Sequence, residues 1–324
     1  MPCAAALLVA CLLAGARSGQ QHARELRPWR KRCAPEERHC VEKAGVAVRY
    51  DPEGIQTHFW AKIYWHFDWH IFCTFRQFVN STSVVLDIGG WIGLTAIWFA
   101  KNTRKGKVIV LEPSGRAFDD LLLNIAANPD CMQRVSATNA ALGSRRGILQ
   151  ISDRGDAQDR LLPAATAQGA VGASGDRISD AVVKTIEDLI FQHPELRGVS
   201  FIKVDTEGYE RVILPALAAF LRQVRPVLVV SVHPAAMDTA AMRELAGQLH
   251  ALFPFLDIID VVGDPIQPAC ERVRLHRLRP NVSGFPQTSS DKDRPIKVLC
   301  TWDKDQREIT RAADLGLLSA FKGR

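Results

Sequence analysis

The 324-residue sequence predicts an α/β fold, with a mostly parallel sheet covered by helices on both faces. Short apolar runs typical of buried strands alternate with segments that have the 3.6-residue periodicity of amphipathic helices. Several of these runs also end in a polar side chain, as expected where parallel strands deliver chemistry to one edge of a sheet. The residues at these strand ends are Asp87, Glu112, Asn139, Asp205 and His233.

The elements can be placed in chain order from this alternation. Residues 55–79 carry aromatic side chains at helical spacing, which predicts an N-terminal helical extension that packs on the sheet; a lid or an aromatic platform for a sugar ring is the alternative. Strands are expected over 84–88, 107–111, 135–139, 201–204, 227–232, 256–260 and 296–301, with a hairpin arm over 147–151. Helices are expected over 94–101, 114–127, 211–221 and 242–252, the second capped by Ser114.

The other segments suggest a domain organisation. Residues 1–16 contain an apolar run that ends in Ala14-Gly15-Ala16, as a secretory signal peptide does, although an uncleaved anchor is an alternative. Residues 17–54 are expected to form a basic arm or linker, and 55–264 the main domain. Within that domain, 152–181 lacks periodicity and predicts a mobile loop. Residues 265–324 are expected to form a C-terminal extension that completes the sheet.

Charge and cysteine content indicate the compartment and exclude some partners. The net charge of +6 comes from the two ends, since 17–50 has nine basic and four acidic residues and 265–324 has twelve and seven. Basic tails without a clustered basic face do not favour nucleic-acid binding. Six cysteines remain after signal cleavage, an even number that permits disulfides in an oxidising compartment, with Cys33 and Cys40 the favoured local pair. Sequons at Asn80 and Asn281 agree with a protein of the secretory-pathway lumen or a secreted one.

The turn after the first core strand predicts a cofactor site. It reads Asp87-Ile-Gly89-Gly-Trp-Ile-Gly93, and Ile88 stands where a pyrophosphate-binding Gly-x-Gly-x-x-Gly turn would need its first glycine. An acidic strand end suits a cationic ligand instead, and S-adenosylmethionine carries both an amine and a sulfonium. Glu112, at the end of the next strand, can accept the two hydroxyls of a ribose. The alternative is a plain strand–helix–strand crossover with a glycine turn.

A second group of residues predicts the chemistry. Asp205, Glu207 and Glu210 follow the buried strand 201–204 within six residues, and His233 ends the neighbouring strand. They could orient the cofactor, bind a substrate hydroxyl or act as a general base; a helix-capping cluster and a structural histidine are the alternatives. Because no Cys-x-x-Cys pair or Cys/His cluster has zinc spacing, no metal site is expected, although Asp205 and Glu207 could hold Mg²⁺ in a metal-assisted variant.

These motifs resemble the FkbM-type S-adenosylmethionine-dependent methyltransferases over about residues 82–235. The matching segments are Asp87–Gly93, Leu111-Glu112-Pro113, Asn124 to Asn128, Asn139-Ala140-Ala141-Leu142-Gly143, Thr185–Leu189 and, most specific, Lys203–Glu210. Gly90-Trp91 departs from the family's usual Ala-Asn. The resemblance implies a class I methyltransferase (Rossmann-like) sheet, cofactor contacts by Gly89 and Gly93, and ribose binding by Glu112. It also places Asn139 or Ala140 near the adenine.

The resemblance further implies O-methylation of a sugar or other small hydroxylated acceptor. Because the sulfonium is already activated, the protein mainly aligns the acceptor and removes a proton, which we assign to Asp205 or His233 with Glu207 and Glu210 positioning the acceptor. The alternatives are an NAD-dependent oxidoreductase or epimerase, disfavoured by Ile88, and a non-catalytic luminal binding module. The expected partners are a small-molecule or glycan acceptor and no nucleic acid, with a membrane involved only if the N-terminal segment is an uncleaved anchor.

Overall fold

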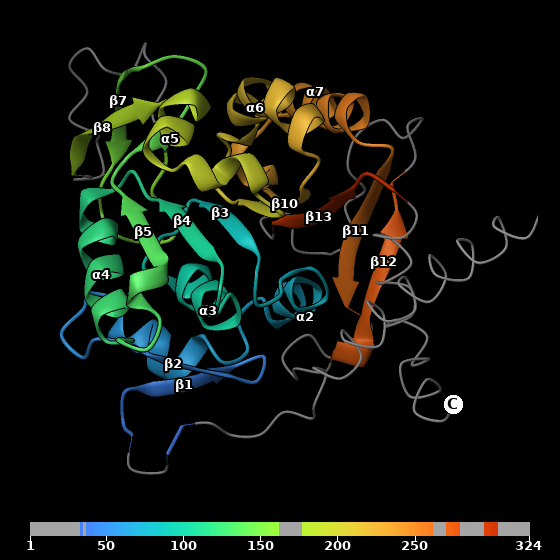
Figure 1. Cartoon of the computed structure of the whole chain (residues 1–324). Helices are drawn as coiled ribbons and strands as arrows, with labels where there is room; N and C mark the ends of the chain where they lie inside the picture. The colour runs from blue at the N-terminus through green and yellow to red at the C-terminus, as the bar shows by residue number, and fades with distance from the viewer. Residues whose placement is uncertain (1–32, 35–36, 162–176, 262–269, 279–294, 304–324) are drawn as a thin grey trace, which may run out of the picture.

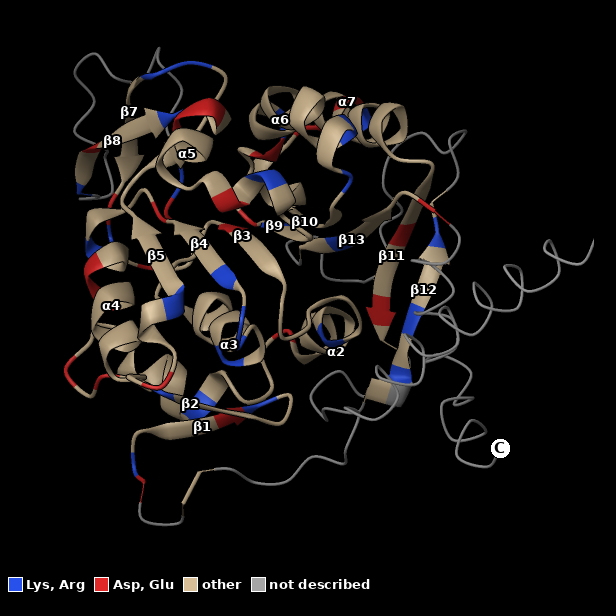
Figure 2. Ribbon diagram, viewed as in Figure 1, with Lys and Arg blue, Asp and Glu red and all other residues tan. Residues whose placement is uncertain are grey.

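Strands that are separated by helices in the sequence lie side by side in one sheet, with helices on its two sides (Figure 1). Figure 2 marks the charged residues in the same view. The computed structural model of the chain describes residues 33–34, 37–161, 177–261, 270–278 and 295–303. The predicted signal peptide, the rest of the basic arm before Cys33 and the central part of the 152–181 segment lie outside these residues. In the described parts of the chain, no helix combines the length and the apolar content needed to cross a membrane.

The main sheet has the strand order β12-β11-β13-β10-β9-β3-β4-β5. In that order the strands span Val273–Arg277, Phe255–Val261, Ile296–Thr301, Val227–Val232, Phe201–Val204, Val84–Ile88, Lys107–Leu111 and Val135–Thr138. Neighbours from β10 to β5 are parallel, whereas β13 runs antiparallel to both β10 and β11, and β12 antiparallel to β11. The predicted mostly parallel sheet is therefore confirmed, and β12 and β13 of the 265–324 segment form part of one side of it.

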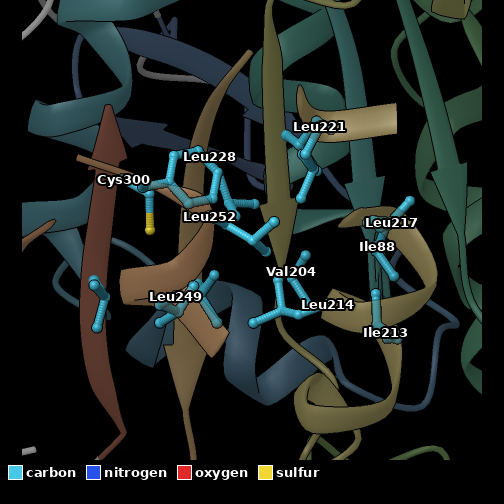
Figure 3. Close-up of a cluster of buried hydrophobic side chains, with 14 of the residues drawn as sticks. Ile88, Val204, Ile213, Leu214, Leu217, Leu221, Leu228, Leu249, Leu252 and Cys300 are labelled. Carbon is cyan, nitrogen blue, oxygen red and sulfur yellow. The ribbon is translucent and has the colours of Figure 1, made fainter. Parts of the chain in front are cut away.

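Helices cover both faces of this sheet. On one face lie α5 (Ile186–Gln192), α6 (Glu210–Val224) and α7 (Thr239–Leu252), which pack a buried apolar cluster against the strands (Figure 3). The opposite face is covered by α2 (Trp69–Phe78), α3 (Leu94–Asn102) and α4 (Gly115–Ala126), with a second apolar cluster. Adjacent residues of one strand, such as Val85 and Leu86, belong to opposite clusters. This alternation explains why the core strands are apolar throughout.

The aromatic extension packs as expected for a helical segment. A short π-helical turn, η1 (Phe59–Ile63), precedes α2, and Trp60, Tyr64, Phe72 and Phe75 are all buried. Phe75 contacts Phe201 of β9 with ring centroids 5.4 Å apart, which fixes α2 on the sheet. A disulfide between Cys73 and Cys270 ties α2 to the residues that lead into β12.

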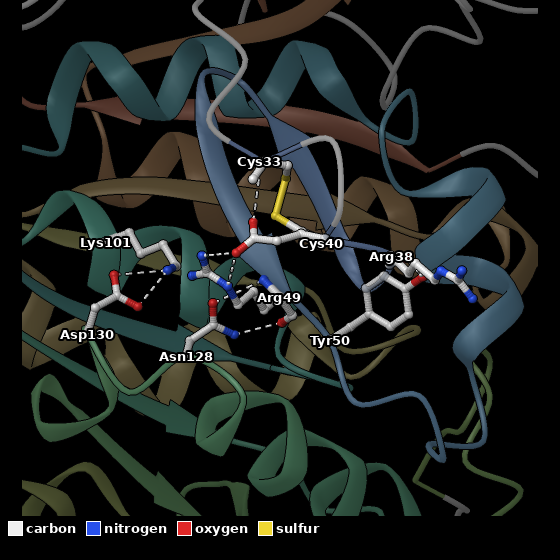
Figure 4. The surroundings of a disulfide bond; sticks show 10 residues. Cys33, Arg38, Cys40, Arg49, Tyr50, Lys101, Asn128 and Asp130 are labelled. Carbon is white, nitrogen blue, oxygen red and sulfur yellow. Dashed lines mark hydrogen bonds and ion pairs between the residues drawn. A yellow bond between two sulfur atoms is a disulfide. The ribbon is translucent and has the colours of Figure 1, made fainter.

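Two sequence expectations were wrong about strands. Part of the 17–54 arm is a β-hairpin, β1 (Cys40–Lys43) and β2 (Val46–Arg49), whose turn places Ala44 and Gly45 at positive φ. Val46 and Val48 are buried, so period-two alternation was present but short. The predicted Cys33–Cys40 disulfide forms at the start of this hairpin, beside the contacts of Arg49 and Asn128 (Figure 4).

The second correction concerns the predicted loop over 152–181. Its last residues begin β8 (Ile178–Lys184), which pairs antiparallel with β7 (Gly147–Ser152) and parallel with the short β6 (Ala141–Leu142). The hairpin arm over 147–151 is thus real, and its partner strand was missed because the pairing skips the intervening residues. Residues 162–176 lie outside the described part.

Candidate active site

The ends of neighbouring strands bring the predicted residues to one edge of the main sheet. β3, β4, β9 and β10 are parallel, so Gly89, Glu112, Asp205 and His233 follow their strands on the same side. β13 runs the other way, so that its first residues, Ile296 and Lys297, lie opposite Val232 and Ser231. This arrangement explains why residues more than 200 positions apart in the chain can meet.

The glycine turn after β3 is built against the next strand. Gly89 has a φ of 82°, and a Cβ placed on it would lie 1.8 Å from the carbonyl oxygen of Asp205. Glycine is therefore required at position 89 because the chain after β9 comes so close, whether or not a ligand also binds there. Gly93, at φ 94°, is the residue from which α3 starts, and it leaves the first N–H groups of that helix at the site.

Trp91 occupies the middle of this turn in an unusual conformation. Its φ of 46° lies in the left-handed region, which costs a residue with a side chain about 1–2 kcal/mol. Three contacts hold it: its N–H donates to Glu112 Oε2 at 2.7 Å, its indole N–H donates to the Gly155 carbonyl at 3.2 Å, and its ring packs edge-on against Phe59. The turn is thereby tied to the end of β4 and to the 153–160 segment.

Asp87 lies beneath the glycine turn and is paired within the protein, and its predicted role as a cofactor ligand stays a prediction. Its side chain is fully buried, Thr95 Oγ1 donates to Oδ2 at 2.6 Å, and Lys203 Nζ lies 3.2 Å from Oδ1. Burial raises the pKa of Asp87, with Lys203 and Thr95 opposing the shift. Lys203 also donates to the Gly89 carbonyl at 2.9 Å. Asp87 thus holds the lysine that holds the turn, and the carboxylate itself is enclosed by protein.

Glu112, the predicted ribose acceptor, is held at the end of β4 by backbone hydrogen bonds. Its two oxygens accept the backbone N–H groups of Trp91 at 2.7 Å and Ser114 at 2.8 Å, which fixes the orientation of the carboxylate. Burial raises the pKa of Glu112 to about 7 against these two hydrogen bonds. Asn139, exposed at the end of β5, donates to the Glu112 and Pro113 carbonyls, and the next residue, Ala140, is buried. The glycine turn, through Trp91, and Asn139 therefore both contact Glu112.

Two acidic residues beside Glu112 were missed by the sequence. The hydroxyl of Ser114 lies 2.6 Å from Asp153 Oδ1 and 3.0 Å from Asp159 Oδ2, and Asp159 also accepts the Arg154 and Gly155 N–H groups. Ser114 caps α4 as predicted, accepting the N–H of Ala117. The 153–160 segment is thus fastened to the tip of β4, and nothing in its irregular composition indicated this.

His233 lies at the centre of the second group. Its Nε2 is 3.3 Å from Asp205 Oδ1 and 3.1 Å from Glu207 Oε1, and its Nδ1 is 3.1 Å from Glu210 Oε1. Glu207 takes a positive φ of 51° just before Gly208, a turn that directs its carboxylate back to the imidazole. All four residues singled out from the sequence as catalytic candidates are therefore brought together.

The electrostatics of this cluster bear on the predicted assignment of the base, which stays a prediction. Burial acts to lower the pKa of His233, but Asp205, Glu207 and Glu210 outweigh it and raise that pKa to about 11, so the imidazole is protonated near neutral pH. Burial acts to raise the pKa of Asp205, but Lys297, Lys203 and His233 hold it well below its usual value. Neither group is a ready proton acceptor in this state, because His233 is already charged and Asp205 is paired with cations.

Lys297 and Asp68 complete the network, and neither was predicted from the sequence to have a role in the site. Lys297 Nζ lies 3.0 Å from Asp68 Oδ2, 3.5 Å from Asp205 Oδ2 and 2.8 Å from Ser231 Oγ. Burial acts to lower the pKa of Lys297, but Asp205 and Asp68 raise it above its usual value. A lysine inside an otherwise apolar strand was the available signal for both Lys203 and Lys297. Asp68, placed by the turn before α2, had none.

Among the described residues, two groups offer ligand atoms close enough to hold a metal ion. One consists of Cys33, Glu37 and Cys40, but its cysteines form a disulfide and cannot act as thiolate ligands. The other is Asp205, Glu207 and His233, whose ligand atoms all lie within 4.8 Å of one another. The sequence analysis expected no metal site, but the fold brings these three possible ligand atoms close together.

Comparison with known proteins identifies the family. The sequence profile of the methyltransferase FkbM domain matches residues 87–252, more than half of the chain, and this range includes the glycine turn, Glu112, Asp205 and His233. No curated protein matches the chain. The strand order, with β13 reversed between β10 and β11, agrees with the class I methyltransferase fold that the resemblance implied.

Solved structures with a similar fold include three methyltransferase-type proteins. Methyltransferase FkbM from Methylobacillus flagellatus shares 15% identity over 68% of this chain at a TM-score of 0.42, and this chain spans only 44% of that structure. An S-adenosylmethionine-dependent O-methyltransferase from Thermotoga maritima shares 12% identity (72% and 64% of the two chains, TM-score 0.37). The fibrillarin pre-rRNA processing protein of Methanococcus jannaschii shares 11% (84% and 86%, TM-score 0.40). By its domain match, this chain belongs to the FkbM methyltransferase family.

Proposed function

We propose that this protein transfers the methyl group of S-adenosylmethionine to a hydroxyl group of a small molecule or glycan. One observation carries the proposal: the Gly89 turn joins the Glu112 site to the Asp205–His233 cluster inside the matched domain. Lys203 contacts both Asp87 and the Gly89 carbonyl, while Gly89 touches the Asp205 backbone. A cofactor on one side of this turn would therefore face an acceptor on the other.

The cofactor half of the site consists of Gly89, Gly93, Glu112, Asn139 and Ala140. Glu112 would accept the ribose hydroxyls, because its carboxylate is oriented by two backbone N–H groups and stands at the tip of the strand beside the turn. Asn139 holds the Glu112 and Pro113 carbonyls, so that the chain beside Ala140 could border the adenine. Asp87 would contribute through Lys203, by fixing the turn.

The acceptor half consists of Asp205, Glu207, Glu210 and His233. Transfer breaks the bond between the methyl carbon and the sulfonium sulfur and forms one to the acceptor oxygen, whose proton must leave to the protein or to solvent. Of the two carboxylates that face Nε2, Glu207 has the more exposed side chain, 29% against 23% for Asp205. An incoming hydroxyl would therefore meet Glu207 first.

Two exposed aromatic side chains that precede Asp68 in the chain could contact an acceptor with a flat or ring-shaped face. Trp65 and Phe67 are 44% and 37% exposed and lie just before Asp68, whose carboxylate contacts Lys297. Exposed aromatic rings are typical contacts for the apolar face of a sugar or an aromatic ring. This supports the aromatic-platform alternative for these two residues, whereas Trp60 and Tyr64 pack the core. We expect Trp65→Ala to raise the KM for the acceptor and to leave cofactor binding unchanged.

We further propose that the protein works in the lumen of the secretory pathway or is secreted. Two disulfides, Cys33–Cys40 and Cys73–Cys270, support an oxidising compartment. Protease protection of the full chain in sealed microsomes would test this placement; digestion without detergent would contradict it.

Calorimetric titration of the purified chain with S-adenosylmethionine, S-adenosylhomocysteine and NAD⁺ tests the activity. The first two should bind and NAD⁺ should not. Glu112→Ala should weaken both by on the order of tenfold or more, because it leaves the ribose hydroxyls without their acceptor. Glu187→Ala, at an exposed glutamate in the first turn of α5, is the matched control and should bind as the native chain does.

Two other outcomes of this titration would support the alternative functions. Binding of NAD⁺ alone would favour an oxidoreductase or epimerase on the same fold. Binding of none of the three would favour a non-catalytic luminal binding module.

A further inference from the structure

The two nitrogen atoms of His233 face three carboxylates and no other described ion-pair partner. Nε2 lies 3.3 Å from Asp205 and 3.1 Å from Glu207, and Nδ1 lies 3.1 Å from Glu210. His233 and Glu210 are buried, so water cannot separate these groups freely. An imidazole in this position needs a positive charge on or beside it.

The hydrogen bonds of Glu210 decide which nitrogen carries a proton. Glu210 Oε1 accepts the N–H and the hydroxyl of Thr206 at 2.9 and 3.1 Å, and a carboxylate in that role has no proton to give to His233. Nδ1 must therefore be the donor in its contact with Glu210. Nε2 faces Asp205 and Glu207, and a cation that displaced its proton would bind the Nε2 lone pair, as in metal-binding histidines whose second nitrogen is oriented by a carboxylate.

The spacing of the three atoms at Nε2 fits a shared cation. Two ligands at about 2.1 Å from an ion are about 3.0 Å apart at right angles and about 3.4 Å apart at a tetrahedral angle. The distances from Nε2 to Asp205 and Glu207 fall in this interval. All three ligand atoms lie within 4.8 Å of one another.

The charge of the network also leaves room for a cation. Its members are five carboxylates and two lysine ammonium groups, namely Asp68, Asp87, Asp205, Glu207, Glu210, Lys203 and Lys297. Lys203 is bound to Asp87 and Lys297 to Asp68, so Asp205 Oδ1 and Glu207 face His233 alone. Glu210 belongs to the same network, and its buried Oε2 has no hydrogen-bond partner among the residues that the structure describes, although buried polar atoms are nearly always satisfied.

We propose that Asp205 Oδ1, Glu207 Oε1 and His233 Nε2 bind one divalent cation, with Glu210 orienting the imidazole. Two carboxylate oxygens and one imidazole form a mixed oxygen and nitrogen donor set, which suits a first-row divalent ion such as Mn²⁺ better than Mg²⁺, which is bound mainly by oxygen ligands. Mn²⁺ is the probe because its binding can be followed by electron paramagnetic resonance. Resting on the proposed function, the role of the ion is to take the acceptor oxygen as a further ligand and acidify its proton. Glu207 and the acceptor hydroxyl would then bind the same ion.

Mn²⁺ binding to the full chain, freed of metal by chelation and dialysis, tests the site without any methyl acceptor. Loss of the free Mn²⁺ electron paramagnetic resonance signal should reveal one bound ion per chain. Electron spin-echo modulation should show coupling to one imidazole nitrogen. Glu207→Gln should weaken binding by at least roughly tenfold, and Glu210→Gln, which loses the orienting carboxylate, by a similar factor. Because Glu207 is partly exposed, its substitution should leave the fold intact, which circular dichroism would confirm.

A matched control comes from a second histidine–carboxylate pair. His193 Nδ1 lies 3.8 Å from Glu195 Oε1, with a single carboxylate at the imidazole. His193→Gln should leave both the Mn²⁺ affinity and the nitrogen coupling unchanged. Absence of binding at millimolar Mn²⁺, or equal weakening in the His193 and Glu207 variants, would overturn the proposal and leave His233 as a protonated structural imidazole.

Titration of the same metal-free chain with S-adenosylhomocysteine separates this proposal from the proposed function. Cofactor binding without Mn²⁺ binding would sink the metal site and keep the methyltransferase. Mn²⁺ binding without cofactor binding would do the reverse.

Discussion

Gly89 of the turn after β3 lies so close to the Asp205 carbonyl that a Cβ would come within 1.8 Å of the oxygen. The contact joins the cofactor half of the site to the acceptor half, and Lys203 reinforces it by donating to the Gly89 carbonyl. The position of β9 relative to β3 at this edge therefore depends on the absence of one methyl group.

Gly89→Ala should lower the free energy of unfolding by more than about 1 kcal/mol, because it adds a backbone clash to a left-handed φ. Gly247→Ala, in the interior of α7 with open space around it, should instead raise stability by up to about 1 kcal/mol through helix propensity. Urea denaturation of both variants measures the contrast. If both variants changed the free energy of unfolding equally, the close contact at Gly89 would not contribute to stability.

Asp87 and Lys203 form a buried pair across β3 and β9, so removing one partner should cost more than removing both. Lys203→Met should destabilise the chain by about 3–5 kcal/mol, since Asp87 is left charged and enclosed. The double variant Asp87→Asn, Lys203→Met should recover a large part of that loss. A double-mutant cycle in urea measures the coupling.

The Lys101–Asp130 pair provides the control for this cycle. Its separation is 2.8 Å, but Asp130 is 56% exposed, and Lys101→Met should cost no more than about 1 kcal/mol from the ion pair. A cycle in which the Asp87 and Lys203 substitutions simply add would mean that the buried pair is not coupled.

Glu112 should make cofactor binding depend on pH. Because burial raises the pKa of Glu112 to about 7, the carboxyl is mostly protonated at pH 6 and mostly ionised at pH 8. The ionised form accepts ribose hydroxyls more strongly, so S-adenosylhomocysteine should bind up to about tenfold more tightly at the higher pH. Calorimetry at both pH values measures this difference.

Glu112→Gln should bind more weakly and lose this pH dependence. Asp119→Asn, at an exposed carboxylate of α4, should keep it. A pH dependence that survives in Glu112→Gln would assign the titrating group elsewhere.

The two disulfides should differ in how much they stabilise the chain. Cys73 and Cys270 are 197 residues apart, against 7 for Cys33 and Cys40. Loop entropy predicts a loss of about 5 kcal/mol when both cysteines of the long bridge become serine, and about 2 kcal/mol for the short one. Chemical denaturation of the two double variants measures the difference, and a larger loss for the Cys33–Cys40 bridge would contradict the loop-entropy account.

The sequence predicted most of the sheet because its strands are buried on both faces and read as uninterrupted apolar runs. Strands whose partner lies far away in the sequence were harder to predict. β8 is the example, since a long segment separates it from its partner β7. The β1–β2 hairpin was missed because each strand has only four residues. Local patterns lose their signal when an element is this short.

The sequence predicted which residues form the candidate site, but it predicted their roles only in part. Asp205, Glu207, Glu210 and His233 do meet, because parallel strands end at one edge. Whether a group is a base or a ligand depends on its charged neighbours, and two of these, Asp68 and Lys297, come from distant parts of the chain. The imidazole predicted to remove a proton turned out to be enclosed by carboxylates that raise its pKa to about 11.

By itself, the sequence determined the α/β fold, the edge of the sheet that carries the site, and the family, since these follow from local periodicity and short motifs. Only the tertiary structure decided that Asp87 supports Lys203 beneath the turn, that Asp153 and Asp159 fasten a segment to Ser114, and that His233 receives three carboxylates. The physical reason is that burial and pairing energies depend on distances between residues far apart in the chain, and those distances are set by how the strands and helices pack.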